Sequence, residues 1–241
     1  MTAILAVKYK DGVVIHSDSL ALNLYTYEDD DIIVNFIDNI GKHRQKVFRI
    51  SLYGVICFSG SNFPLDIMKP IANALSDTIK DRQLRKLTDI AENAKTIIKR
   101  ELKKGQEIQA LIAGYELDED GLPSACSMLH IDGAYKVKEI TENYFALGVG
   151  QLISFKFKRA NWTVPLFNNV EAADKQADVL MSYLSEQEML MQEAGDNDWH
   201  IGGMVRRISI SKAGVKNLPT VRKLPTRVAM WQVYSMEVKD R

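Results

Sequence analysis

Thr2 is the residue whose chemistry we consider first. Only Met1 precedes it, and removal of that methionine would leave a threonine with a free α-amine and a hydroxyl on one residue. An α-amine has a pKa near ~7.7–8.0, so it can be neutral at cellular pH and accept the hydroxyl proton, directly or through a water. A threonine at the amino terminus can therefore act as nucleophile and base together.

Three further residues, Asp18, Lys46 and Gly60, could complete such a site. The reaction needs a cation that keeps the amine deprotonated, a carboxylate that holds the cation, and backbone N–H groups for the oxyanion. Asp18 ends a predicted strand that returns beside the first, Lys46 begins the next strand, and Gly60 ends the one after it. Taken one at a time, each residue also has an ordinary explanation as a turn or strand-edge residue.

Other familiar catalytic and ligand-binding patterns are absent from the sequence. Gly148-Val149-Gly150 lacks the third glycine of a dinucleotide fingerprint, and no GxSxG segment occurs. The histidines have no metal-ligand spacing and are predicted to be structural or surface residues. They are His16, His43, His130 and His200. We therefore expect no cofactor and no metal.

The first element that must position the site is a β-hairpin. Residues 3–9 are mostly aliphatic, residues 13–15 are β-branched, and Asp11-Gly12 between them is a strong turn signal. A polar stretch from Leu24 to Gly41, with an acidic run at 28–31, is predicted to be a solvated, irregular excursion between strands. Short strands are then expected at 47–50 and 53–59.

Helical periodicity follows these strands. Ile67, Ile71, Leu75 and Ile79 recur every fourth residue, and residues 87–103 carry apolar side chains on one face. Strands are next expected at 108–115, 125–131, 134–140 and 144–147, helices from 151 and at 171–193, and a strand at 202–211. This order predicts an α+β fold, a four-layer αββα sandwich of two packed antiparallel sheets flanked by helix pairs. No linker is evident, so we expect one domain over 1–241.

Composition narrows the range of partners. The chain is 46% hydrophobic and 26% charged, with 31 Lys+Arg against 31 Asp+Glu, so its charge gives no reason to expect nucleic acid or an anionic membrane. No run reaches the ~18 apolar residues of a membrane span. Cys57 and Cys126 lie in strand-like segments and are predicted to be reduced core residues. A cytoplasmic location is expected.

Short motifs occur along the chain in a definite order. They are Thr2, the KDG turn with VVIHSD ending at Asp18, KVFRI at 46–50, GVICFSG at 54–60, IAGY at 112–115, FALGVG at 145–150 and DWHIGG at 198–203. No single motif is specific. Together, in this order and spacing, they resemble the proteasome β-type subunits and their bacterial relatives HslV and Anbu, which are N-terminal nucleophile hydrolases. The resemblance covers roughly residues 2 to 215 and leaves 216–241 as a C-terminal extension.

This resemblance implies a role for each matching residue. Thr2, after removal of Met1, would be the nucleophile and its amine the base. Asp18 matches the family's catalytic aspartate, and Lys46 matches the lysine that tunes the amine. Gly60 would give its N–H to the oxyanion, and Asp198 matches the aspartate before the Gly-Gly pair.

The resemblance also implies a substrate pocket and partners. Phe58, two residues before Gly60, would line the pocket for the side chain that precedes the cut bond. Peptide or protein substrates and a homo-oligomeric ring are implied, and an ATPase or another protein that feeds the ring is left open. Two departures concern the amine, because Val149 and Ile201 stand where the family usually has serines.

Three functions fit these features at the level of sequence. The first is a threonine-dependent peptidase or amide hydrolase of the proteasome β-like type. The second is a transpeptidase, in which an amine rather than water resolves the acyl-enzyme. The third is a catalytically silent structural or assembly subunit, which the two missing serines favour and which retained Met1 would enforce. Retention of Thr2, Asp18, Lys46 and Asp198 together argues for an enzyme.

Overall fold

The computed structural model describes residues 3–19, 23–28, 32–38, 45–61, 67–160, 163–193, 203–219, 223–224 and 231–238. Two of the predicted site residues, Thr2 and Asp198, lie outside these ranges. The described part of the chain is α+β, as the sequence predicts, and two five-stranded antiparallel sheets form its centre.

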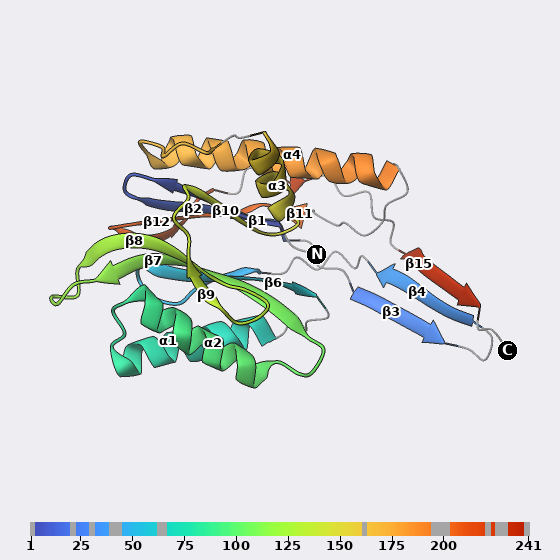
Figure 1. Cartoon of the computed structure of the whole chain (residues 1–241), viewed down its shortest axis with the longest axis horizontal. Coiled ribbons are helices and arrows are strands. Elements are labelled where there is room, and N and C mark those ends of the chain that lie inside the picture. Colours follow the sequence, from blue (N-terminus) through green and yellow to red (C-terminus); the bar gives the residue numbers. More distant parts are fainter. Residues whose placement is uncertain are drawn as a thin grey trace.

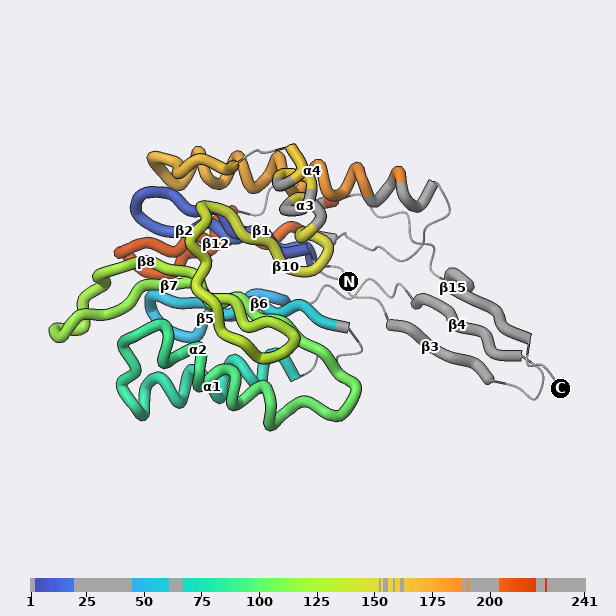
Figure 2. Tube along the Cα trace, viewed as in Figure 1, coloured from blue at the N-terminus to red at the C-terminus, as the bar shows by residue number. Residues whose placement is uncertain are grey.

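The first sheet is built on the amino-terminal hairpin. Its strand order is β10-β1-β2-β12-β13, and every neighbouring pair is antiparallel. The strands are β1 (Ala3–Tyr9), β2 (Gly12–Ser17), β10 (Tyr144–Gly148), β12 (Arg206–Ser211) and β13 (Gly214–Asn217). Figure 2 shows how this sheet joins the first residues of the chain to segments from its second half.

The second sheet has the order β5-β6-β7-β8-β9 and is antiparallel throughout. Its strands are β5 (Val47–Arg49), β6 (Gly54–Ser61), β7 (Glu107–Leu117), β8 (Pro123–Ile131) and β9 (Val137–Glu139). The two sheets pack face to face, and one cluster of buried residues, including Ile4, Ile15, Val55 and Leu111, fills the space between them.

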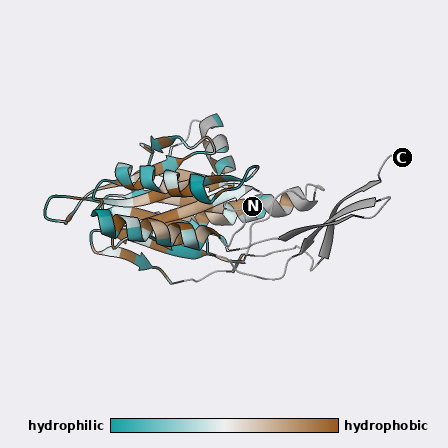
Figure 3. Ribbon diagram, turned by 90° about the horizontal axis from the view of Figure 1, so that it is seen from below, coloured by the Kyte–Doolittle hydropathy of each residue, from teal (hydrophilic) through white to brown (hydrophobic). Residues whose placement is uncertain are grey.

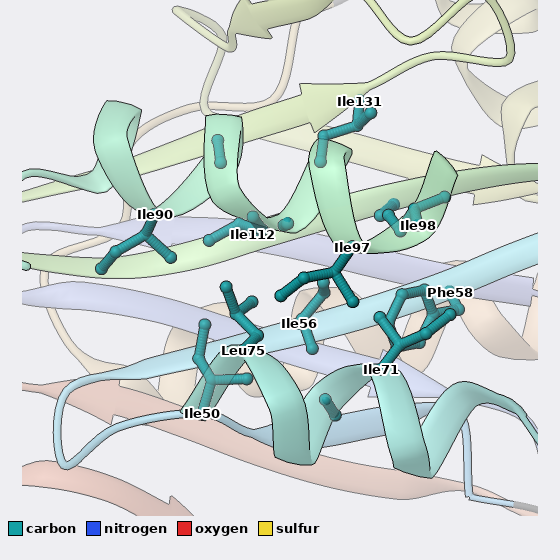
Figure 4. Packing of buried hydrophobic residues seen from close by; sticks show 14 of the residues in the cluster. Ile50, Ile56, Phe58, Ile71, Leu75, Ile90, Ile97, Ile98, Ile112 and Ile131 are labelled. Atoms are coloured by element: carbon teal, nitrogen blue, oxygen red, sulfur yellow. The ribbon is translucent and has the colours of Figure 1, made fainter. Parts of the chain in front are cut away.

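Helices cover the outer face of each sheet (Figure 1). They are α1 (Met68–Arg82), α2 (Leu87–Glu101), α3 (Gln151–Arg159) and α4 (Val170–Glu193). The i, i+4 pattern predicted for α1 is confirmed, since Ile71, Leu75 and Ile79 are buried against the second sheet. Figure 4 shows this cluster, in which Ile71 and Leu75 meet Ile56 and Phe58 from β6. Figure 3, viewed from below, shows hydrophobic residues mostly in the central strands and hydrophilic residues mostly on the helices and peripheral loops.

The turn between β1 and β2 needs its glycine for two reasons. Gly12 has φ of +149°, and a Cβ there would lie 1.8 Å from the carbonyl oxygen of Ile210 on β12. The hydroxyl of Tyr115 on β7 donates to the carbonyl of Asp11 at 2.7 Å. The turn is therefore held by both sheets, which fixes the direction in which β2 returns toward Ala3.

The prediction for the polar stretch at 24–41 was wrong. Strands β3 (Asn23–Glu28) and β4 (Ile32–Asp38) form an antiparallel pair, and β15 (Trp231–Val238) adds to it as a third strand. The β-branched and aromatic residues of both segments favour strands, and the acidic run at their junction concealed that pattern. A separate pair joins β11 (Gly203–Met204) to β14 (Lys223–Leu224), so the strand predicted at 202–211 is two strands.

The described helices give no sign of a membrane span. None of them combines the length and the apolar character that crossing a bilayer requires.

Candidate active site

A buried ion pair joins the two sheets near the start of β1. Lys46 Nζ, just before β5, donates to both carboxylate oxygens of Asp18, at 2.8 Å to Oδ1 and 2.9 Å to Oδ2. Asp18 is 0% exposed and Lys46 is 1% exposed. Removing two charges from water costs several kcal/mol per ion, and apolar residues of similar volume are often at least as stabilising. Stability alone therefore does not explain why this pair is present.

The same carboxylate is bound to the start of the chain. The N–H of Ala3 donates to Asp18 Oδ1 at 2.8 Å, and the N–H of Asp18 donates to the carbonyl of Ala3 at 3.1 Å. Because the nitrogen of Ala3 forms the peptide bond with Thr2, the Asp18–Lys46 pair lies one peptide unit from Thr2. The structure thus brings Asp18 and Lys46, both predicted from the sequence, together beside the residue that follows Thr2.

Two other predicted motifs converge on this point. Gly148, at the end of β10, is the antiparallel partner of Ala3. The N–H of Met204, directly after the Gly-Gly pair, donates to Oγ of Ser19 at 2.8 Å, and Ser19 is fully buried next to Asp18. The FALGVG and DWHIGG motifs therefore end beside the same residues, although they are more than 120 positions distant from Ala3 in the sequence.

Strand geometry places the N–H of Gly60 on the edge of β6 that bonds to Lys46. The N–H of Phe58 donates across to the carbonyl of Lys46 at 3.0 Å. Peptide groups alternate in direction along a strand, so the N–H of Gly60, two residues later, points to the same edge of β6. β5 begins at Val47, which pairs with Cys57, so β6 continues along this edge beyond its bond to Lys46. Backbone N–H groups at such an edge are the donors that an oxyanion site uses.

Gly60 also has a structural reason to be glycine. A Cβ at this position would lie 2.2 Å from the carbonyl oxygen of Glu107 on β7. The close approach of β6 and β7 therefore excludes every side chain at the position where the sequence predicts the oxyanion donor.

The GVG segment differs from the family pattern in a way that the packing explains. Gly148 has φ of +63°, and a Cβ on Gly150 would lie 3.1 Å from the carbonyl oxygen of Ile4. Val149, in the place of the usual serine, is 7% exposed and belongs to the apolar cluster between the first sheet and α3 and α4. At this position the chain gains core packing and has no hydroxyl.

Phe58 lies in the hydrophobic core. Its side chain is 0% exposed and packs under α1, with its ring centroid 5.9 Å from that of Phe48. Its assignment to a substrate pocket stays a prediction, as do the roles of Thr2 and Asp198. Ile201, the other position that departs from the family pattern, also lies outside the described residues.

The two cysteines are not alternative nucleophiles. Burial raises the pKa of the Cys57 thiol far above its usual value and that of Cys126 to about 12. A thiol becomes nucleophilic as the thiolate, so both are inert at neutral pH. Cys57 lies in the core, as predicted, whereas Cys126 is only partly buried. In the described ranges, no group of three or more His, Cys, Asp or Glu residues is arranged to hold a metal ion.

A second buried polar cluster, which the sequence did not reveal, joins α4 to the first sheet. His16 Nε2 on β2 lies 2.7 Å from Oδ1 of Asp174, and Nε of Arg207 on β12 donates to the same oxygen at 3.0 Å. A carboxylate only accepts, so Nε2 of His16 carries a proton and is the donor. His16 Nδ1 is buried and has no hydrogen-bond partner among the described residues. Asp174 is 158 residues from His16 in the sequence. Unlike Asp18, it belongs to no local sequence motif.

Replacing Asp174 with asparagine should make stability depend less on pH. Burial would raise the pKa of this carboxyl, but the hydrogen bonds from His16 and Arg207 together outweigh it and hold the pKa below its usual value. A lowered folded pKa contributes stability above the unfolded pKa of 3.8, and this contribution is lost as pH falls through the folded value.

At neutral pH we expect Asp174→Asn to cost about 2 kcal/mol, from the loss of charged hydrogen bonds. Urea unfolding of both proteins between pH 7 and pH 3 measures this difference, which should shrink toward the acid end. Asp77→Asn, at an exposed position of α1, is the control and should stay within about 0.5 kcal/mol. A difference that is constant across this range would show that the Asp174 charge contributes nothing.

No protein-family model matches the chain, and a search of curated proteins finds no significant match. The assignment of a function therefore depends on the geometry of the site.

Proposed function

We propose that this protein is an N-terminal threonine amide hydrolase of the proteasome β-like type, within the N-terminal nucleophile hydrolase fold. Thr2, made amino-terminal by processing, is the nucleophile, and peptides or proteins are the substrates. A cytoplasmic homo-oligomeric ring, as in the family that the sequence resembles, is part of the proposal.

The observation that carries the proposal is the shared carboxylate of Asp18. It binds Lys46 Nζ and the N–H of Ala3 within 2.9 Å, in an environment from which water is excluded. A buried pair that costs desolvation energy and lies one peptide unit from a threonine is well suited to catalysis. The pairing of Gly148 with Ala3, and the hydrogen bond from the N–H of Met204 to Ser19 next to Asp18, support this reading.

The proposed reaction is an acyl transfer. The neutral α-amine of Thr2 takes the hydroxyl proton while Oγ attacks the substrate carbonyl. The oxyanion that forms accepts a hydrogen bond from the N–H of Gly60. The C–N bond then breaks, the leaving amine takes the proton, and an ester remains on Thr2. Water attacks this ester in the second half-reaction, again with the amine as base, and releases the acid.

The Asp18–Lys46 pair has a defined role in this scheme. A nearby ammonium disfavours protonation of the α-amine, because two like charges repel in a low-dielectric site. The Asp18 carboxylate holds that ammonium in a fixed position and, through the N–H of Ala3, fixes the first peptide unit relative to it. The nucleophile and its electrostatic partner are thus oriented by one side chain.

Hydrolysis of denatured protein substrates tests the proposal. The purified protein, after intact mass has established that Thr2 is the first residue, is incubated with denatured protein substrates, and new amino termini are counted by mass spectrometry. We expect cleavage that is lost in Thr2→Ala and retained in Thr78→Ala, whose hydroxyl donates to a carbonyl within α1. Processed protein that cleaves no amide, or cleaves equally well as Thr2→Ala, would contradict the proposal.

A further inference from the structure

A cavity lies at the turn of the amino-terminal hairpin, at the other end of β1 from Ala3. It has a volume of about 390 Å³, and residues around the β1–β2 turn line it, among them Lys8, Tyr9 and Lys10. Tyr9 is six residues after Ala3 on the same strand, which places the cavity roughly 20 Å from the Asp18 carboxylate at ~3.3 Å per residue. The cavity is therefore separate from the candidate active site, and what it binds does not depend on the proposed function.

The charge of the lining is strongly one-sided. The lining contains three lysines, Lys8, Lys10 and Lys212, and one carboxylate, that of Asp11. The phenol of Tyr9 adds no negative charge, because burial raises its pKa to about 12. The Cys126 thiol, also in the lining, is neutral for the same reason. The cavity thus combines three cations with one anion at neutral pH.

The donors of the cavity are partly fixed in place. Lys8 is half-buried, and its Nζ donates to the carbonyl of Ile140 at 2.7 Å, which uses one of three N–H bonds and leaves two. Lys10 and Lys212 are exposed at the turns β1–β2 and β12–β13, and Ser124 adds a hydroxyl. The anchored ammonium of Lys8 and the two exposed ones of Lys10 and Lys212 can together bind a ligand that carries several negative charges.

The surface of the cavity is mainly polar, and its apolar part is small. The rings of Tyr9 and Tyr115 are about 5–6% exposed, and their hydroxyls are bound to the carbonyls of Ile210 and Asp11. Leu166, which also lines the cavity, is 49% exposed. The volume lies within the ~300–1,000 Å³ of small-molecule sites.

We propose that this cavity is a binding site for a small organic phosphate. The phosphate oxygens take the free N–H bonds of Lys8 and the ammonium groups of Lys10 and Lys212, which act on phosphate as point charges. The apolar body of the ligand lies against Leu166. A single carboxylate would satisfy fewer of the three cations, so the cavity prefers a multivalent phosphate to a simple carboxylate.

Calorimetric titration at constant ionic strength tests this site, with inorganic pyrophosphate and a phosphorylated sugar as probes and acetate for comparison. We expect saturable binding of both phosphates and none of acetate. The double variant Lys10→Met/Lys212→Met should weaken binding at least tenfold without affecting the fold, since both side chains are exposed. Lys69→Met, at an exposed position of α1, is the matched control and should bind as the unmodified protein does.

Three outcomes would overturn the site. They are no saturable binding of either phosphate at millimolar concentration, equal affinity in the double variant and the unmodified protein, and an equal loss of affinity in Lys69→Met. The last result would indicate a general charge effect. Thermal unfolding gives an independent readout, because a ligand that binds only the folded state raises the Tm of the protein and of Lys69→Met but not that of the double variant.

Discussion

Replacing Lys46 with methionine is expected to abolish acylation of Thr2 and to lower the free energy of unfolding by about 3–5 kcal/mol. The methionine has a similar length but no charge, so the fully buried carboxylate of Asp18 loses both hydrogen bonds to Nζ. Only the bond from the N–H of Ala3 is then left of the contacts described for this carboxylate above. Chemical denaturation measures the stability, and mass spectrometry after a short exposure to substrate measures the acyl-enzyme.

A double variant separates the two effects. Lys46→Met/Asp18→Asn removes both charges, so it should be more stable than Lys46→Met alone and still form no acyl-enzyme. Lys138→Met is the control, because its pair with Asp132 is exposed on the side of the lysine and should be worth at most about 1 kcal/mol. Normal acylation in the double variant would show that the ion pair is structural and has no part in the reaction.

Replacing Gly60 with alanine is the second change with a large expected effect. The new methyl group would lie 2.2 Å from the carbonyl oxygen of Glu107, so β6 and β7 must separate locally. Overpacking of this kind costs about 1–3 kcal/mol. Because the displaced peptide carries the proposed oxyanion donor, we also expect kcat to fall by about 10²–10³-fold, the usual effect of losing one such donor.

The matched control for this change is Gly133→Ala. That glycine lies in the loop between β8 and β9, and a Cβ there meets no atom within 4 Å. Stability and kcat should both remain near the values of the unmodified protein. If Gly60→Ala lowers stability but leaves kcat unchanged, the glycine serves the packing of β6 on β7, and the oxyanion donor must be sought elsewhere.

The parts of the fold that the sequence predicted well are those in which a local pattern has one physical cause. The hairpin of β1 and β2 was predicted from β-branched strands and an Asp-Gly turn, and α1 and α2 from apolar residues that recur once per helical turn. In the polar stretch before Gln45, the acidic run outweighed the strand-forming residues on either side. The pairing of β4 with β15 joins residues about 200 positions apart. No local sequence pattern can reveal a pairing at that distance.

The same distinction applies to the candidate site. Asp18, Lys46 and Gly60 stood at strand ends. The structure brings Asp18 and Lys46 into contact, and the N–H of Phe58, two residues before Gly60, donates to the carbonyl of Lys46. The contact of Ser19 with Met204 spans 185 residues, and neither residue type predicts it. Such contacts result from how the sheets pack, so they could be recognised only in the folded chain.

The central claim is that Thr2, at the amino terminus, is the nucleophile beside the Asp18–Lys46 pair. An electrophile with two reactive carbons, which can bond to a hydroxyl and an amine of the same residue, tests it most directly. After treatment of the processed protein, we predict one adduct that peptide mapping assigns to the Oγ and the α-amine of Thr2. Thr2→Ala and Lys46→Met should form no adduct. If the processed protein forms no adduct, or if the adduct still forms in Thr2→Ala, the account is contradicted.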